Sequence, residues 1–167
     1  ERYLLIGELS LDGKVKPTRG ALPMALAARN NGFVGIIVPE GNSRESAVVQ
    51  GVDVFPVSHL TQVVNFLNDI DVLVPQKINV KDLFTRDSRY EIDFDEVKGQ
   101  EHVKRALEIA AAGGHNVMMV GPPGSGKTML AQRLPTILPD LTFEEALETT
   151  KVYSIMGLMS ERALIAT

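Results

Sequence analysis

The sequence has no cysteine, a net negative charge and no long apolar run. With no cysteine among 167 residues, disulfides and thiolate metal sites are excluded, and a reducing, cytoplasmic location is favoured. The net charge of −4 argues against nucleic-acid binding through bulk positive charge, although a local basic patch stays compatible with it. No apolar run approaches the roughly 20 residues of a membrane-spanning helix, so we expect no membrane partner.

What the sequence does contain is typical of a soluble α/β protein. It is 44% hydrophobic and 23% charged, which suits one domain or two small ones. Strand-like and helix-like runs alternate over residues 1–70, and this alternation indicates βαβ units with a largely parallel sheet. The expected strands cover 3–11, 14–16, 33–38 and 52–57, and the expected helices cover 20–30, 43–49 and a segment capped by Ser58.

A change of pattern near residue 70 divides the chain. Residues 71–92 mix charges with few periodic apolar positions, so we expect an inter-domain linker with a short helical turn near 81–84. Residues 93–167 are expected to form a second domain. Its expected elements are a helix over 101–112, a strand over 116–120, and a helix that runs from a Thr142–Glu145 capping box to Met156.

The strongest motif lies directly after the expected strand at 116–120. The sequence Gly-Pro-Pro-Gly-Ser-Gly-Lys-Thr fits the P-loop pattern G-x-x-x-x-G-K-[ST]. Its glycines let the backbone curl so that N–H groups converge on phosphate oxygens. Lys127 supplies a cation for the β- and γ-phosphates, and the Thr128 hydroxyl can bind Mg²⁺. With ATP and Mg²⁺ as cofactors, the predicted site is Gly121, Pro122, Pro123, Gly124, Ser125, Gly126, Lys127 and Thr128.

An acidic strand end, which hydrolysis would need, does not follow this loop. Such a strand usually closes in Asp-Glu, where it holds Mg²⁺ and polarises the attacking water. Glu144 and Glu145 instead stand at an expected helix start, where helix capping explains them. We therefore assign no catalytic residue, and we expect this chain to bind nucleotide weakly at best, without turning it over. Because it opens without methionine inside an expected strand, we also expect a fragment of a longer protein.

Residues 93–134 combine Val97-Lys98-Gly99-Gln100 with a helix and the P-loop, and they resemble the start of an AAA+ ATPase module. The first four residues are similar to the segment that lines the adenine pocket in that superfamily, which adds Val97, Gly99 and Gln100 to the predicted nucleotide site. The whole chain resembles the magnesium-chelatase-like ComM/YifB family of bacterial proteins. This resemblance rests on Gly7–Gly13 with Arg19–Pro23, on Asp95–Gln100 with the following helix, and on Leu134–Pro139 leading to Tyr153–Gly157.

The resemblance implies two partial domains. Residues 1–70 would be the C-terminal half of a Lon-protease-like, S5-like α/β domain. Residues 93–167 would be the N-terminal part of a P-loop AAA+ parallel-sheet domain, ending before the acidic Mg²⁺-binding strand. In Lon proteases the corresponding helix carries a catalytic lysine, and here Leu22 takes that place, so the resemblance implies no peptidase activity. It also implies a hexameric ATPase in the full-length protein, with ATP-driven branch migration of DNA during natural transformation.

Two other functions stay open from the sequence. One is the ATPase subunit of a metal chelatase, against which the Lon-like half argues. The other is a non-catalytic scaffold in which the P-loop is only a nucleotide-binding or structural element.

A further expectation concerns folding: one clear strand after residue 95 cannot complete an AAA+ sheet. We therefore expect residues 96–167 to be partly disordered, or to be stabilised by contacts with the first domain or another chain.

Overall fold

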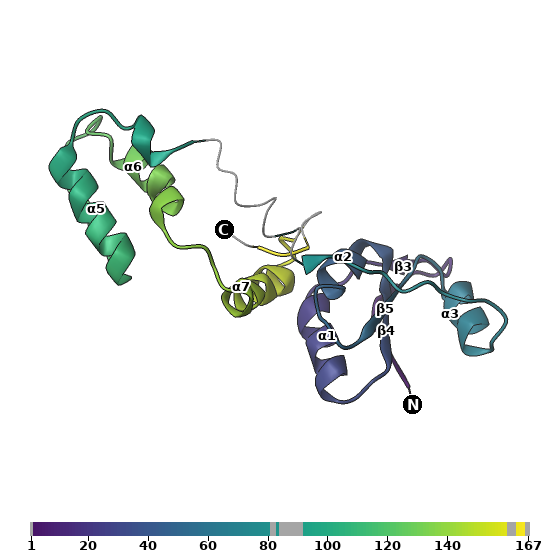
Figure 1. The fold of residues 1–167 in the computed structure, drawn as a ribbon. Coiled ribbons are helices and arrows are strands. Elements are labelled where there is room, and N and C mark those ends of the chain that lie inside the picture. Colours follow the sequence, from purple (N-terminus) through teal and green to yellow (C-terminus); the bar gives the residue numbers. More distant parts are fainter. Residues whose placement is uncertain (1, 81–82, 84–91, 160–162, 166–167) are drawn as a thin grey trace.

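The structure, a computed structural model, describes residues 2–80, 83, 92–159 and 163–165. Its N-terminal part is built on a parallel sheet of β1 (Tyr3–Leu5), β4 (Gly35–Pro39) and β5 (Asp53–Val57), in the order β1-β4-β5 (Figure 1). Tyr3 pairs with Gly35, and Gly35 pairs with Asp53. The chain is therefore of the predicted α/β class.

Helices connect the parallel strands, and a polar clamp fixes the loop that leads into the first of them. α1 (Ala21–Asn30) precedes β4, η1 (Glu40–Asn42) and α2 (Ser43–Ser46) lie between β4 and β5, and α3 (Leu60–Leu67) follows β5.

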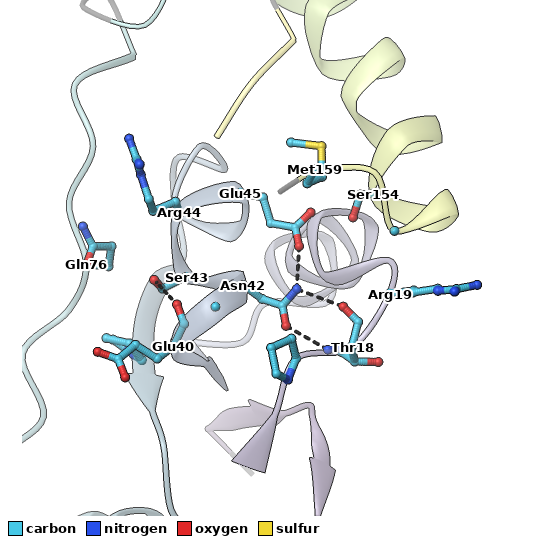
Figure 2. Close-up of a pocket in the computed structure, with 14 residues that line it drawn as sticks. Thr18, Arg19, Glu40, Asn42, Ser43, Arg44, Glu45, Gln76, Ser154 and Met159 are labelled. Atoms are coloured by element: carbon cyan, nitrogen blue, oxygen red, sulfur yellow. Dashed lines mark hydrogen bonds between the residues drawn. The ribbon is translucent and has the colours of Figure 1, made fainter. Parts of the chain in front are cut away.

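The Asn42 side chain accepts a hydrogen bond from the Thr18 N–H and donates one to the Thr18 carbonyl, both at 2.9 Å (Figure 2). It also donates to Glu45 Oε1 at 2.6 Å. This clamp holds Thr18, three residues before α1 begins.

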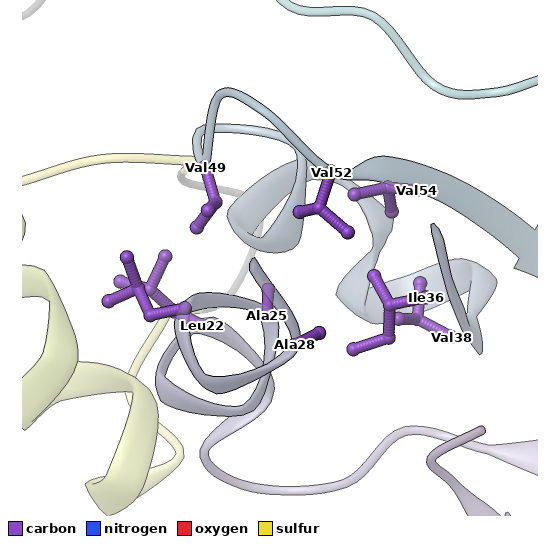
Figure 3. Close-up of a cluster of buried hydrophobic side chains, with 9 residues drawn as sticks. Leu22, Ala25, Ala28, Ile36, Val38, Val49, Val52 and Val54 are labelled. Carbon is purple, nitrogen blue, oxygen red and sulfur yellow. The ribbon is translucent and has the colours of Figure 1, made fainter. Parts of the chain in front are cut away.

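Apolar side chains form a core on each face of the sheet, because successive side chains of a strand point to opposite faces. The first core lies between the sheet and α1 (Figure 3) and contains Leu22, Ala25, Ala28, Ile36, Val38 and Val54. The second core lies between the sheet and α3 and contains Ile37, Phe55, Val57 and Val63. The uninterrupted burial of β4 on both faces explains why its sequence reads as a continuous apolar run.

The single long strand predicted over 3–11 is wrong, because the structure divides it into two short strands. β1 ends at Leu5, and β2 (Glu8–Leu9) forms an antiparallel hairpin with β3 (Val15–Lys16). Gly7 stands between them with φ of 140°, and a Cβ at this position would lie 2.7 Å from Val15 Cγ1. Glycine therefore lets the chain leave the parallel sheet and enter the hairpin.

The second part of the described chain is helical. It contains η2 (Phe94–Glu96), α5 (Glu101–Gly113), α6 (Lys127–Arg133), η3 (Leu134–Ile137) and α7 (Phe143–Met156), so the helix predicted over 101–112 is confirmed. No helix in the described ranges is both long enough and apolar enough to cross a membrane. The helical turn predicted over 81–84 lies outside the described residues, apart from residue 83.

The strand predicted over 116–120 is also wrong. Val117, Met118 and Val120 are 45%, 88% and 84% exposed, and residues 92–159 contain no β-strand. A strand forms only when a neighbour supplies partners for its N–H and C=O groups. Within the described ranges no neighbouring strand pairs with this segment, so it has no regular secondary structure.

α7 packs against α1, although the residues in contact are 132 positions apart in the sequence (Figure 1). The Ser154 carbonyl accepts a hydrogen bond from the Gly20 N–H at 2.9 Å, and Ser154 Oγ accepts one from the Leu22 N–H at 3.4 Å. Gly20 precedes α1 and has no side chain to cap it, so Ser154 satisfies a free donor at the start of that helix. Contacts with the first part of the chain, expected for residues 96–167, are thus confirmed for α7.

The predicted capping box starts α7. Thr142 Oγ1 accepts a hydrogen bond from the Glu145 N–H at 3.3 Å, and Glu145 Oε2 accepts one from the Thr142 N–H at 2.8 Å. The bonds from the Thr142 backbone and hydroxyl hold the pKa of the Glu145 carboxyl below its ordinary value. A local signal that spans four residues was therefore enough to place this helix start.

We predict that Ser154→Ala weakens the contact between α7 and α1. The substitution leaves the Leu22 N–H without its acceptor, which should lower the free energy of unfolding by about 1 kcal/mol. Hydrogen exchange at Leu22 and thermal unfolding measure the effect. Tyr153→Phe removes a hydroxyl from the neighbouring, partly exposed residue and is the control. Equal exchange rates at Leu22 in both variants would contradict the capping role of Ser154.

Candidate functional site

The P-loop has the backbone conformation that its glycines were expected to allow. Gly124 and Gly126 have φ of 78° and 84°, in the left-handed region that glycine adopts without strain. A Cβ at Gly121 would lie 3.0 Å from Ser125 Oγ. These three glycines therefore give the loop its tight curvature. α6 begins at the next residue, Lys127.

The Lys127 ammonium lies against the inside of this curve. Its Nζ donates to the carbonyls of Gly121 and Pro122, both at 2.8 Å, and to Ser125 Oγ at 3.2 Å. Carbonyls and a hydroxyl are neutral acceptors, and a charged phosphate oxygen forms a stronger, charge-assisted bond with an ammonium. Lys127 is thus positioned to exchange these partners for an anion held in the loop.

The remaining loop residues are accessible. Pro122, Pro123, Gly124 and Thr128 are exposed, and Ser125 is half-buried. In the described ranges no group of three or more His, Asp or Glu side chains is placed to hold a metal ion. A Mg²⁺ ion that takes most of its ligands from water and phosphate needs only one protein hydroxyl, and Thr128 can supply it. Its role as a metal ligand stays a prediction.

The segment 97–100 lies beside the loop, but its three predicted site residues differ in what they can contact. Val97 is 1% exposed and packs with Phe94, Leu107 and Leu130, so its side chain serves the core. Gly99 is exposed and has φ of 71°. Gln100 reaches the loop directly, since its Nε2 donates to the Ser125 carbonyl at 3.3 Å.

A cavity of about 440 Å³ lies between α5, the segment 117–120 before the loop, and the loop itself. One side is apolar and includes Val103, Leu107 and Met118. The other side carries polar groups of Gln100 and Lys127. This arrangement can take a ligand that has a flat apolar part next to an anionic part.

Arg133 is a structural residue of the site that the sequence pattern did not reveal. Its guanidinium donates to Glu96 Oε2 at 2.7 Å and to the Asp93 carbonyl at 3.1 Å. The Arg133 side chain is 16% exposed, so these bonds are partly shielded from water. They tie α6, which follows the loop, to the segment that precedes α5. No signal could have found them, because the partners are about forty positions apart.

A larger cavity of about 860 Å³ lies between the loop before α1, α2 and the end of α7 (Figure 2). Glu45, Asn42 and Ser154 contribute to its lining. The Glu45 side chain is buried, and its Oε2 atom has no hydrogen-bond partner. That oxygen is closed to solvent, so a ligand in the cavity cannot reach it in this arrangement. We interpret Glu45 as part of the Asn42 clamp.

Leu22, where the resemblance to Lon proteases expects a catalytic lysine, is completely buried in the core between α1 and the sheet. A leucine has no titratable group, and this one faces other apolar side chains. The position therefore supplies no group for proton transfer.

Comparison with protein families shows the class of protein to which this chain belongs. Residues 93–167 match the family described as magnesium chelatase, subunit ChlI, and residues 1–42 match the family described as subunit ChlI of Mg-chelatase. Together with the P-loop and the α/β fold, these matches place the chain in the AAA+-like ATPase family of the magnesium-chelatase type.

Individual relatives narrow the class. YifB of Escherichia coli is 40% identical over 160 residues, which cover 96% of this chain and 31% of that protein. The competence protein ComM of Haemophilus influenzae is 38% identical over 157 residues, which cover 93% of this chain and 31% of that protein. The chain belongs to the ComM/YifB-like magnesium-chelatase family. It spans about a third of the length of these curated relatives.

A Lon protease matches a shorter part of the chain. The archaeal Lon protease of Archaeoglobus fulgidus is 34% identical over 89 residues, which cover 53% of this chain and 11% of that protein. This match, together with the parallel three-stranded sheet, supports a partial Lon-like domain followed by the start of an AAA+ module. The boundaries at 1–70, 71–92 and 93–167 stay predictions.

We predict that Arg133→Gln loosens the contact between α6 and the segment before α5. The change removes a partly shielded ion pair and its hydrogen bonds, which should lower the free energy of unfolding by about 1 kcal/mol. Chemical denaturation measures it. Arg105→Gln is the matched control, because Arg105 also pairs with a glutamate, Glu108, but is 72% exposed. An equal loss of stability in both variants would contradict the role of Arg133 in holding α6 to the segment before α5.

Proposed function

We propose that this chain binds ATP and Mg²⁺ through Gly121–Thr128, and that the full-length protein is a cytoplasmic AAA+ ATPase. The observation that carries the proposal is the Lys127 ammonium, held inside a loop whose Gly124 and Gly126 adopt left-handed conformations. A glycine-rich loop can present several backbone N–H donors to one anion. Such donors and the Lys127 cation would complement the negative charge of a triphosphate.

Each part of the proposed site has a separate task. Lys127 binds β- and γ-phosphate oxygens, and the loop N–H groups bind the others. The Thr128 hydroxyl takes one position on Mg²⁺, which when bound neutralises phosphate charge. The apolar side of the 440 Å³ cavity, with Val103 and Leu107, receives the adenine ring. Val97 supports that wall from the core, and Gly99 and Gln100 stand at its entrance.

Turnover requires more than these residues. The described part of the chain presents no acidic strand end beside the loop, so we assign no catalytic residue and propose that this chain binds nucleotide without hydrolysing it. In the full-length protein we propose a hexamer, in which sites between subunits hydrolyse ATP. The AAA+-like family supports this assembly.

The proposed work of the full-length protein is ATP-driven movement of DNA, namely branch migration during natural transformation. The identity of 38% to a protein named competence protein ComM supports it. The magnesium-chelatase families support the main alternative, an ATPase subunit for metal insertion into a tetrapyrrole. A Lon-like domain at residues 1–70 supports the first function, because a simple chelatase subunit is not expected to carry one, whereas the match of residues 1–42 to subunit ChlI of Mg-chelatase supports the chelatase. A non-catalytic scaffold is the third possibility.

We predict saturable binding of ATP with Mg²⁺ to this chain, measured by isothermal titration calorimetry. Lys127→Ala should weaken it about 10- to 100-fold, since a charged hydrogen-bonding partner is lost. Lys151→Ala removes a lysine that pairs with Glu148 on α7 and should leave the affinity unchanged. No saturable heat with the wild-type chain, or equal heats with Lys127→Ala, would favour the scaffold.

We predict that the full-length protein unwinds branched DNA in an ATP-dependent reaction, and that Lys127→Ala abolishes it. A gel assay on a labelled four-way junction measures the product. Unwinding that does not depend on ATP would contradict the DNA function. ATP hydrolysis stimulated by a tetrapyrrole and not by junction DNA would favour the chelatase.

A further inference from the structure

Gln100 has an unusual backbone conformation. Its φ of 58° and ψ of 38° lie in the left-handed region, and among the described non-glycine residues only Asp69 also has a positive φ. Aspartate tolerates this region through local hydrogen bonds, whereas glutamine has no such advantage. A strained residue of this kind persists only where its surroundings enforce it, and such residues cluster at functional sites.

The strained conformation gives the backbone and the side chain of Gln100 separate tasks. Its carbonyl accepts from the Val103 and Lys104 N–H groups at 2.9 and 3.0 Å, which starts α5. Its side chain makes no capping bond to that helix. The side-chain amide instead turns to the P-loop and donates to the Ser125 carbonyl at 3.3 Å.

The amide also fills the space beside the next loop residue. A Cβ added to Gly126 would lie 3.2 Å from Gln100 Nε2. The amide therefore lies where a side chain at position 126 would otherwise be, and Lys127 comes next in the chain. Packing supports the strain from both sides, because Val97 and Leu107 flank Gln100 in the sequence and are each 1% exposed.

We propose that Gln100 is a positioning residue that holds the P-loop for the triphosphate, and that it does not read the base. In a trans peptide the C=O and the N–H point in opposite directions. A bond from Gln100 to the Ser125 carbonyl therefore turns the Gly126 N–H away from α5 and leaves it available as a donor. This donor binds the triphosphate, so the contribution of Gln100 to affinity does not depend on the base that the ligand carries. This inference rests on the proposed nucleotide site.

The test compares three ligands that share only the triphosphate. The dissociation constants of ATP, GTP and inorganic triphosphate, each with Mg²⁺, are measured by calorimetry for the wild-type chain and for Gln100→Ala. Loss of one neutral hydrogen bond should weaken all three by about three- to ten-fold and by the same factor. A loss confined to ATP would overturn the proposal, because it would mean that Gln100 reads adenine. Unchanged affinity for all three would overturn it as well.

Two glycine variants separate positioning from folding. Gln100→Gly removes both the side-chain amide and the backbone strain. It should therefore lose as much affinity as Gln100→Ala, but it should melt at a higher temperature than Gln100→Ala. Asp69→Gly relieves the same type of strain away from the loop and should leave all three affinities unchanged. If Gln100→Gly kept wild-type affinity, the amide contact would have no role. If the wild-type chain bound none of the three ligands, the proposed function would fail first.

Discussion

The hydrophobic cluster of Phe94, Val97, Leu107 and Leu130 is the contact on which the geometry of the P-loop depends. P-loops commonly lie at the end of a strand within a sheet, and the described part of this chain offers no such support beside the loop. Leu107 of α5 and Leu130 of α6 meet in the cluster, so the two helices that flank the loop are held together by side-chain packing. Arg133 adds polar bonds at its edge.

This packing also explains why one strained residue can touch the loop. Once Val97 and Leu107 are buried, the chain between them must turn sharply, and Gly99 and Gln100 take left-handed conformations to do so. The Gln100 amide then lies against Ser125 and Gly126. The position of the Lys127 ammonium and the conformation of its loop thus follow from a core that contains neither.

A second long-range contact joins the two parts of the chain. The P-loop leads through α6 and η3 to α7, whose Ser154 caps the start of α1. Leu22, two residues into α1, is at the centre of the Lon-like core. The part that contains the P-loop and the Lon-like part are therefore connected by packed elements as well as by the chain between them.

The signals that predicted structure correctly were local ones. The alternation of strands and helices, the Thr142–Glu145 capping box and the helix over 101–112 each depend on residues within a few turns of one another. The predictions that were wrong depended on distant partners. The segment 116–120 has strand character but no neighbouring strand among the described residues, and the run over 3–11 is broken at Gly7 by a close approach of Val15.

The sequence by itself identified the P-loop motif, because the spacing of Gly121, Gly126 and Lys127 fits the pattern and places a cation at the start of a helix. It also determined the α/β class through its periodicity. Only the tertiary structure decided that Val97 serves the core, that Gln100 contacts the loop and that Ser154 caps α1. These roles depend on pairs of residues that lie between about ten and 132 positions apart in the sequence. Burial of apolar surface has no preferred direction. The pattern along the chain therefore could not specify which of these residues would meet.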